Sequence, residues 1–305
     1  MLLGAGKRAL QEEARDMIVI IGGTGRLGAL VAEQVAALGE RARVVARTQP
    51  PRAVAPAEFV AADVRAPETL RAALEGADVV VSAVHGLDPK TGQSPAGVDR
   101  DGNRNLIAAA RDVGAQIVLV SVIGASPQHP MELFRMKAAA EQALRDGPED
   151  WTIVRASAFA ETWADIVRST TGRRGVAKVF GRGENPINFV AVDDVAAAVT
   201  RAATDRSLRG EVIEVGGPES LTMTQLARLV TGRPEVGHIP RAALRVLGVV
   251  LAPVRPGAAR LIRTALAQDS ADLRFDPAAS RTRHPWLGCT PIEHVLAAPT
   301  PLELQ

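Results

Sequence analysis

The sequence predicts an α/β protein built on a doubly wound parallel sheet, and three observations point to this class. Short apolar runs alternate with helix-like stretches from Met17 to about residue 155. The runs are continuously apolar, as expected of strands that are covered on both faces. A glycine-rich turn follows the first run directly, where such sheets bind ligands. We therefore expect a sheet-based domain over residues 17–155 and a smaller part over residues 156–305, interleaved with it.

The expected elements follow one another in a regular order up to residue 155. Apolar, β-branched runs predict strands over Met17–Ile21, Arg43–Ala46, Phe59–Ala61, Ala77–Val84, Gln116–Val120 and Thr152–Val154. Helical spacing predicts helices between them over Leu27–Leu38, Pro67–Leu74, Asn103–Val113 and Glu132–Leu144. Strands that alternate with helices in this way are typical of a parallel sheet.

Beyond residue 155 the pattern is less regular. It predicts a strand over Glu211–Val215 and helices over Asp193–Ala203, Thr222–Thr231, Arg241–Leu251 and Ala258–Ala267. Thr222 is the expected N-cap of its helix, and Gly232 is the residue expected to end that helix.

Composition excludes several classes of protein. The chain has 305 residues, of which 47% are hydrophobic and 23% charged, which suits a folded core rather than a disordered chain. A net charge of +2 gives little attraction to nucleic acid, and no segment reaches the roughly 20 apolar residues of a membrane span, so we expect neither partner. The single Cys289 favours a cytoplasmic location. Residues 1–16 lack a continuous apolar core and are expected to be an N-terminal extension rather than a signal peptide.

The glycine-rich turn lies between the first predicted strand and the first predicted helix. It consists of Gly22, Gly23, Thr24, Gly25, Arg26, Leu27 and Gly28. Glycines at these spacings let the backbone amides approach a pyrophosphate, and the start of the helix then faces its charge. Because the strand and helix context separates this motif from an ordinary glycine-rich turn, we predict that it binds a dinucleotide.

The residue after the second strand bears on which dinucleotide binds. Enzymes selective for NAD place an acidic residue there, and this chain places Arg47. Guanidinium groups pair well with a phosphate dianion, so Arg47, with Arg26 in the loop, favours NADP(H) over NAD(H). A solvated surface arginine is the alternative for Arg47. Asp63 and Val64, after the third strand, are expected beside the adenine, and a plain turn aspartate is the alternative there.

One lysine lies on the apolar face of a predicted helix. Leu133, Lys137, Ala140 and Leu144 are spaced by four, three and four residues, which directs Lys137 inward. A buried ammonium is costly, so such a lysine is paired, reaches the surface or takes part in chemistry. Four of the 36 Lys and Arg residues are lysines, a bias that suggests a GC-rich bacterial genome. Because the chain uses arginine almost everywhere else, a lysine at this inward position is a candidate active-site residue.

A series of segments resembles the atypical short-chain dehydrogenase/reductase superfamily, especially its NmrA-like and isoflavone-reductase-like branch. They are IVIIGGTGRLG (18–28), VVAR (44–47), AADV (61–64), ADVVVSAV (77–84), DRDGNRNLIAAARDVGAQIVLVSVIGAS (99–126), FRMKAAAEQAL (134–144), WTIVRASAFAETW (151–163), NFVAVDDVAAAV (188–199) and EVIEVGGPESLTMTQLA (211–227). The resemblance covers about residues 17–230 and implies an extended Rossmann fold with a small C-terminal substrate-binding part.

The resemblance also implies where the cofactor lies. Ala83 and Val84, after the fourth strand, and Ser157 and Phe159, after the sixth, would bind the dinucleotide. Ser121 and Lys137 would lie near its nicotinamide, where the Lys137 ammonium would bind the cofactor ribose or stabilise a developing oxyanion.

The family's catalytic residues are only partly present. The usual tyrosine position, four residues before the active-site lysine, is Leu133, and the chain contains no tyrosine, so the Tyr–Lys mechanism is excluded. The isoflavone-reductase-like branch lacks this tyrosine and keeps the lysine, which matches Lys137. The family's serine falls near Ser121–Ile123.

Several residues are candidates for the substrate site. His85 follows the fourth strand and is either a proton relay or a hydrogen-bonded loop histidine. Ile123, Phe134, Trp163 and Phe189 are expected to line an apolar cleft, with core packing as the alternative. The histidines lack metal-ligand spacing, so we predict no metal.

Together these features predict an NADP(H)-dependent oxidoreductase that transfers hydride to a small apolar acceptor such as a quinone, an enone or a carbonyl compound. Lys137 would be its active-site cation. The alternative is a non-catalytic, NADP(H)-sensing regulator, as NmrA-like proteins can be. The sequence carries no signature of an oligomeric interface.

Overall fold

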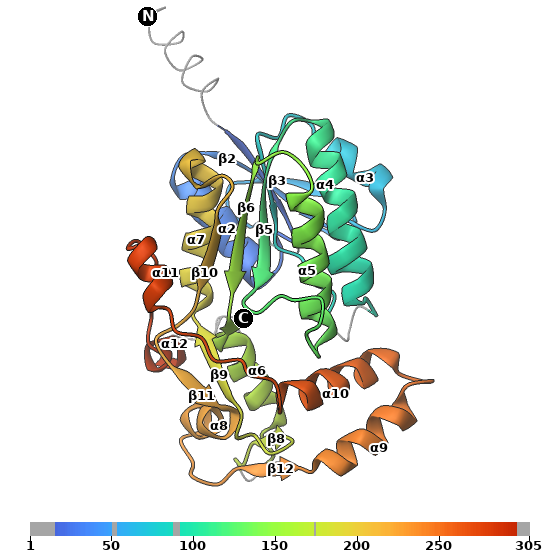
Figure 1. Cartoon of the computed structure of the whole chain (residues 1–305), viewed down its shortest axis with the longest axis vertical. Helices are drawn as coiled ribbons and strands as arrows, with labels where there is room; N and C mark the ends of the chain where they lie inside the picture. Colours follow the sequence, from blue (N-terminus) through green and yellow to red (C-terminus); the bar gives the residue numbers. More distant parts are fainter. Residues whose placement is uncertain (1–15, 51–53, 88–91, 174, 298–305) are drawn as a thin grey trace, which may run out of the picture.

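A parallel sheet of seven strands forms the centre of the protein, in the order β10-β6-β5-β4-β1-β2-β3 (Figure 1). The strands are β1 (Met17–Ile21), β2 (Arg41–Ala46), β3 (Glu58–Ala61), β4 (Val79–Ser82), β5 (Gln116–Val122), β6 (Trp151–Ala156) and β10 (Val212–Val215). The computed structural model describes residues 16–50, 54–87, 92–173 and 175–297, so the predicted N-terminal extension lies outside the described residues except for Asp16. The doubly wound α/β fold is confirmed.

The direction in which the sheet grows reverses at β1. The chain adds β2 and β3 on one side of β1, then returns to place β4, β5 and β6 on the other side. The carboxyl ends of parallel strands meet at one edge of the sheet, and the point of reversal is where such folds bind ligands. The loops after β1 and β4 are therefore adjacent at this edge.

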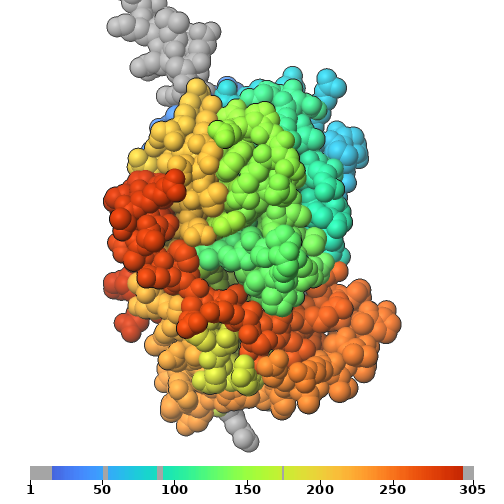
Figure 2. Space-filling view, in the orientation of Figure 1, coloured from blue at the N-terminus to red at the C-terminus, as the bar shows by residue number. Residues whose placement is uncertain are grey.

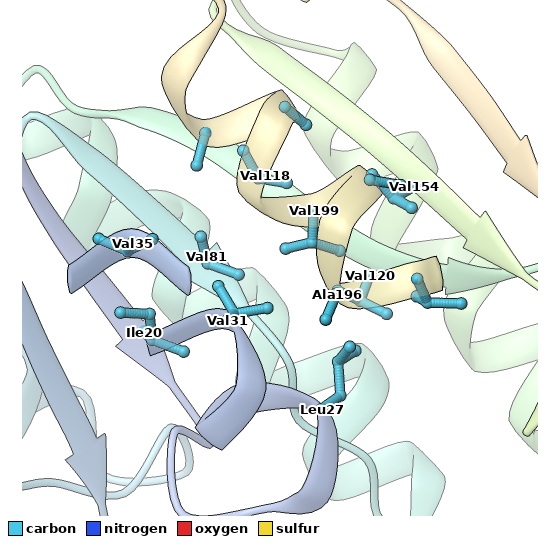
Figure 3. Close-up of a cluster of buried hydrophobic side chains, with 14 of the residues drawn as sticks. Ile20, Leu27, Val31, Val35, Val81, Val118, Val120, Val154, Ala196 and Val199 are labelled. Atoms are coloured by element: carbon cyan, nitrogen blue, oxygen red, sulfur yellow. The ribbon is translucent and has the colours of Figure 1, made fainter. Parts of the chain in front are cut away.

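Helices cover both faces of the sheet (Figure 1). One face carries α2 (Arg26–Ala37) and α7 (Val192–Thr204), and the other carries α3 (Pro67–Ala73), α4 (Asn103–Asp112) and α5 (Glu132–Arg145), with a π-helix, η1 (Ala96–Gly102), before α4. Val31 and Val35 of α2 and Ala196 and Val199 of α7 pack on strand residues such as Val118, all of them fully buried (Figure 3). This burial on both faces explains the continuously apolar strands.

The C-terminal part adds two small sheets below the carboxyl edge. One contains β7 (Ala158–Phe159), β9 (Pro186–Val190) and β11 (Ser220–Thr222), and the other contains β8 (Lys178–Phe180) and β12 (Gly237–Ile239). Its helices are α6 (Ala160–Thr170), α8 (Met223–Thr231), α9 (Arg241–Leu251), α10 (Pro256–Gln268), α11 (Ala278–Arg283) and α12 (Ile292–Ala297), with a short 3₁₀ turn, η2 (Arg206–Leu208), after α7. Within the described ranges, no helix is both long and apolar enough to cross a bilayer.

Several boundaries follow the sequence signals closely. Thr222 forms a capping box with Gln225 at the start of α8, and Gly232 ends this helix with a φ of +65°. The strand predicted over 77–84 is shorter, because only Val79–Ser82 pairs with its neighbours. Ala83 and Val84 therefore lie in the loop beyond β4.

Candidate functional site

The glycine loop follows β1 and turns into α2 at the carboxyl edge of the sheet. Gly22 has a φ of +81°, and a Cβ on it would lie 2.8 Å from the carbonyl oxygen of Ala83, beyond β4. A Cβ on Gly28, in the first turn of α2, would lie 2.3 Å from the carbonyl oxygen of Gly22. The loop, the helix and the neighbouring strand end are thus packed too closely for any side chain at these two positions.

The start of α2 has the features of an anion site. Its N-cap residue is Gly25, so no side chain caps the first amides of the helix, and the first turn contains no acidic residue. Thr24 and Gly25 are exposed. The first amides of a helix have no partner within it and lie at the positive end of the helix dipole. This start of α2 can therefore bind a pyrophosphate.

The side chain of Arg26 is already paired. Its guanidinium binds the carboxylate of Asp165 on α6, and Asp165 also accepts a 3.0 Å hydrogen bond from Arg168. This ion pair connects the glycine loop to the C-terminal part. The neighbouring Glu161 accepts hydrogen bonds from the Val192 amide at 3.0 and 3.2 Å, and burial raises the pKa of its carboxyl group.

Two arginines flank Asp63 at the carboxyl ends of β2 and β3. Arg65 forms an ion pair with Asp63 at 2.6 Å, and its hydrogen bonds hold the pKa of Asp63 below the ordinary value. The charge of Arg47 acts on this pKa in the same direction, which places Arg47 near Asp63. Arg47 is exposed, whereas Val64 is buried. A cation is therefore accessible where the sequence predicts the 2′-phosphate.

Lys137 is buried at the carboxyl ends of β4 and β5, with 3% of its surface exposed. Its Nζ donates to the carbonyl oxygens of Val84 and Val120, each at 2.9 Å, and lies 3.0 Å from Oδ1 of the fully buried Asp99. The ammonium thus donates two hydrogen bonds to carbonyl oxygens and forms an ion pair with a buried carboxylate. Lys137 therefore connects the loop after β4, the end of β5 and the helix that carries Asp99.

The pair of Asp99 and Lys137 belongs to a larger buried network. Asp99 Oδ2 accepts a 2.8 Å hydrogen bond from the Gly86 amide, and the Asp99 carbonyl accepts one from Asn103 Nδ2 at 2.8 Å. Ser82, the last residue of β4, donates to Asn103 Oδ1 at 2.6 Å. Asp99 lies on the π-helix η1, a geometry that often occurs at functional sites. The network fixes the loop after β4 against η1.

The side chain of Ser121 contacts α5 and not the loop after β4. Its hydroxyl donates a 2.5 Å hydrogen bond to Glu141, which also forms an ion pair with Arg155 at 2.6 Å. Ser121 and Glu141 are buried, and the bond to Glu141 raises the pKa of Arg155. These residues join β5, α5 and β6 within the fold.

The loop after β6 carries the other residues expected at the cofactor. Ser157 donates its amide to the carbonyl oxygen of Val215 at 3.1 Å, while its hydroxyl is buried and has no hydrogen-bond partner within the described residues. Phe159 is half-buried beside the core of the sheet. A polar atom without a partner at this edge can receive a hydrogen bond from a ligand.

The residues expected at the substrate do not form one cluster. His85 is exposed and accepts from the Leu87 amide at 3.3 Å, and the Ile123 amide donates to the carbonyl oxygen of Ala156. Phe134 stacks on His129 with ring centroids 4.1 Å apart. Trp163 and Phe189 pack in the core of the C-terminal part, where Phe189 is 3% exposed.

Sequence reasoning missed Asp99 and Glu141, the two buried carboxylates on which these networks depend. Asp99 lies in the run DRDGN, where neighbouring charges make it look like part of an exposed turn. Glu141 lies four residues after Lys137 on α5, and this spacing was the available signal. A carboxylate on the inward face of a helix predicts a cation nearby, because an unpaired buried charge is costly.

A family model described as NAD(P)H-binding matches residues 22–206. The chain belongs to this family. The resemblance to atypical short-chain dehydrogenases/reductases of the NmrA-like branch is thereby confirmed. The matched region begins at the glycine loop and ends after α7, so it contains the carboxyl ends of β2, β3, β4, β5 and β6.

Proteins similar to this chain include named reductases. The NAD(P)H azoreductase of Xenophilus azovorans is 29% identical over 228 residues, 72% of this chain and 75% of the azoreductase. The (4-alkanoyl-5-oxo-2,5-dihydrofuran-3-yl)methyl phosphate reductase of Streptomyces griseus is 31% identical over 226 residues, again 72% and 75%. The NADPH complex of the quinone oxidoreductase QOR2 from Escherichia coli shares the fold, with a TM-score of 0.71 and 22% identity over 92% of this chain and 99% of that chain.

The NAD(P)H-binding family implies a nicotinamide dinucleotide, and the geometry fits one. The tightly packed glycine loop, the start of α2 without an acidic residue and the unpartnered hydroxyl of Ser157 lie along one edge of the sheet. The general class is therefore that of NAD(P)H-dependent oxidoreductases. Among the described residues, no group of His, Cys, Asp and Glu side chains is arranged to hold a metal ion.

Proposed function

We propose that this chain is an NADPH-dependent reductase that transfers hydride to a small apolar acceptor, namely a quinone, an enone or a carbonyl compound. The observation that carries the proposal is the glycine loop at the reversal point of the sheet, where Gly22 and Gly28 leave space only for backbone. The names of the relatives, which include an azoreductase and a furanone phosphate reductase, support reduction of an electron-poor acceptor.

The proposed preference for NADPH depends on the ends of β2 and β3. No acidic residue ends β2, and the exposed Arg47 stands there instead. Arg65 is occupied by Asp63, so the charge of Asp63 is partly balanced before a cofactor binds. A guanidinium binds a phosphate dianion through charge-assisted hydrogen bonds. Arg47 is therefore the residue that we assign to the 2′-phosphate.

Arg47→Ala is expected to raise the Kd for NADPH about tenfold and to leave the Kd for NADH unchanged, because NADH has no 2′-phosphate to lose. Titration of the intrinsic tryptophan fluorescence with each nucleotide measures both values. Arg41→Ala is the matched control, since Arg41 is an exposed arginine at the opposite end of β2. Equal weakening of both nucleotides, or tighter binding of NADH by the unaltered protein, contradicts the assignment.

The polar side chains expected at the reaction site mainly hold other parts of the protein in place. The cofactor supplies the hydride when it is bound. We propose that Lys137 fixes the carbonyls of Val84 and Val120, and hence the loop after β4, rather than donating to the substrate, because its buried ammonium donates to both carbonyls and forms an ion pair with Asp99. Ser121 is left out of the proposed cofactor contacts because its hydroxyl is bound to Glu141. Ser157, whose buried hydroxyl has no hydrogen-bond partner among the described residues, is the residue that we assign to the nicotinamide.

The same observations favour a second candidate function, a sensor that binds NADP(H) without chemistry. The chain has no tyrosine, and the lysine and serine expected at the reaction site are committed to Asp99 and Glu141. A protein of this kind binds the dinucleotide at the same loop and changes its contacts with a partner. The two candidates differ in whether bound NADPH is consumed.

Oxidation of NADPH separates the two candidates. We expect the absorbance of NADPH to fall when a benzoquinone, an alkyl enone or an azo dye is added to the full-length protein, at a rate well above that of NADPH without protein. The Gly28→Ala variant serves as a control for reduction that does not involve the site. Tight binding of NADPH with no oxidation by any of these acceptors would support the sensor instead.

A further inference from the structure

The helix α9 has an apolar face that no described part of the chain covers. Of the eight large hydrophobic residues that are exposed in the described chain, five lie on α9 and the turn after it: Val246 (66%), Leu247 (45%), Val249 (75%), Val250 (61%) and Val254 (72%). The opposite face of α9 packs on α10 through the buried Leu244. A helix that is apolar on both faces is typical of a covered position.

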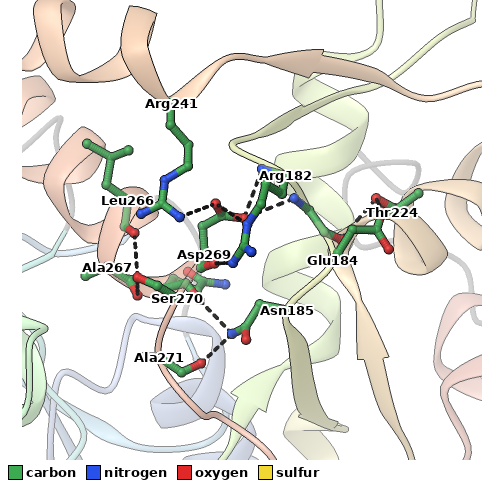
Figure 4. Close-up of polar contacts among 12 residues, drawn as sticks. Arg182, Glu184, Asn185, Thr224, Arg241, Leu266, Ala267, Asp269, Ser270 and Ala271 are labelled. Atoms are coloured by element: carbon green, nitrogen blue, oxygen red, sulfur yellow. Dashed lines mark hydrogen bonds and ion pairs between the residues drawn. The ribbon is translucent and has the colours of Figure 1, made fainter.

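The exposed face belongs to a firmly held element. At the base of the hairpin formed by α9 and α10, Asp269 accepts hydrogen bonds from the amides of Arg182 and Gly183, both at 3.0 Å, and forms an ion pair with Arg241 at 3.4 Å (Figure 4). Arg260 of α10 donates to the carbonyl oxygen of Gln93 at 2.7 Å. The hairpin therefore projects from the C-terminal part in a fixed orientation, with α9 on the outside (Figures 1 and 2).

The hairpin is also strongly basic. Residues 236–268 contain no Asp or Glu and include Arg241, Arg245, Arg255, Arg260 and Arg263. Two of these arginines pair with carboxylates elsewhere, Arg241 with Asp269 and Arg260 with Glu132. The other three are exposed and form no ion pair among the described residues. The hairpin thus carries both exposed apolar side chains and unpaired positive charge, although the whole chain has a net charge of only +2.

We propose that α9 docks on the surface of a bilayer that contains anionic phospholipids. Valine and leucine side chains can enter the acyl boundary while the arginines contact lipid phosphates, as in helices that lie in the plane of a membrane. With 11 residues, α9 is too short to cross a bilayer. The absence of a membrane-spanning segment led us to expect no membrane partner, but a helix that lies on the bilayer surface needs no such segment.

A second copy of the chain fits the same surface less well. A symmetric dimer through α9 would bring the free arginines of both copies together, and neither hairpin has a carboxylate to pair with them. Anionic headgroups provide the missing negative charge. The proposal does not depend on the proposed reductase activity, because it concerns only the outer face of α9 and is tested without NADPH or an acceptor.

Co-sedimentation of the full-length protein with lipid vesicles tests the proposal. We expect binding to vesicles of phosphatidylcholine mixed with phosphatidylglycerol, and binding about tenfold weaker to phosphatidylcholine alone or at high salt. The double variant Val249→Ser, Val250→Ser is expected to bind the mixed vesicles at least about tenfold more weakly, because it removes apolar surface from the docking face. A variant with Arg245→Gln and Arg263→Gln is expected to lose the preference for anionic vesicles.

Leu38→Ser is the matched control, because Leu38 is 63% exposed at the end of α2, outside the hairpin. It should bind vesicles like the unaltered protein, and thermal melting should show that all the variants fold. The proposal is overturned if the unaltered protein does not bind mixed vesicles, or if the double valine variant binds them equally well. Light scattering that shows a dimer which the valine variant abolishes, without vesicle binding, would assign the surface to a second copy.

Discussion

Lys137→Met is expected to lower the free energy of unfolding by about 3–5 kcal/mol, a large share of the stability of an ordinary domain. Methionine fills similar space but has no charge and no donor. The substitution leaves the fully buried Asp99 without its cation and leaves the carbonyl oxygens of Val84 and Val120 without the Lys137 hydrogen bonds. Removing one partner of a buried pair costs more than the pair itself contributes.

A double-mutant cycle identifies the source of this loss. Urea unfolding of Lys137→Met, Asp99→Asn and the double variant measures each free energy. The double variant should be less destabilised than the sum of the single variants, because asparagine carries no charge that needs a cation. Glu58→Gln provides a surface control, since its ion pair with Arg43 is exposed. A Lys137→Met protein as stable as the unaltered one would contradict the buried ion pair.

Gly28→Ala is expected to weaken NADPH binding by about a hundredfold and to lower the free energy of unfolding by about 1–3 kcal/mol. The new methyl group would lie 2.3 Å from the carbonyl oxygen of Gly22 and 2.7 Å from the Cα atom of Gly23. Both contacts are with backbone, so the loop itself must move away from α2. The amides that are proposed to bind the pyrophosphate move with it, and fluorescence titration and urea unfolding measure the two losses.

Substitutions of Gly25 and Gly172 distinguish weaker NADPH binding from a general loss of stability. A Cβ on Gly25 would meet only the Gly22 carbonyl oxygen, at 3.3 Å, so Gly25→Ala should leave stability nearly unchanged while its methyl group obstructs the start of α2. Gly172 has no atom within 4 Å of such a Cβ, so Gly172→Ala should alter neither property. If Gly28→Ala binds NADPH as tightly as the unaltered protein, the loop is not the pyrophosphate site.

The sequence predicted the central sheet well because its signals are local. Continuous apolar runs marked the strands, and the bounds predicted for α9, Arg241–Leu251, agree with the structure because Pro240 and Pro253 flank the helix. The π-helix η1 was missed because the run AGVDRDG has two glycines and three charges and no clear apolar period. The position of this helix depends on the burial of Asp99, and contacts with Gly86 and Lys137, which are distant in the sequence, determine that burial.

Site residues were harder to predict than elements, because partners far apart in sequence decide where a side chain points. The spacing on α5 correctly predicted that Lys137 points inward, but the groups that it contacts come from the loop after β4, from β5 and from η1. Ser121 was expected near the nicotinamide, and the structure directs its hydroxyl to Glu141 on α5. The side chains of a strand alternate between its two faces, and the end of β5 lies at Val122 rather than at the predicted Val120.

The position of β10 at the edge of the central sheet affects how the chain folds during its synthesis. β10 lies beside β6 in the sheet, and α7 supplies much of the core on that face, yet the C-terminal strands β7, β8 and β9 intervene in the sequence. During synthesis, β6 therefore has an unpaired edge and a bare apolar face until residue 215 has emerged. The two parts of the molecule must mature together, and a fragment ending at residue 156 is expected to aggregate rather than to fold as a nucleotide-binding domain.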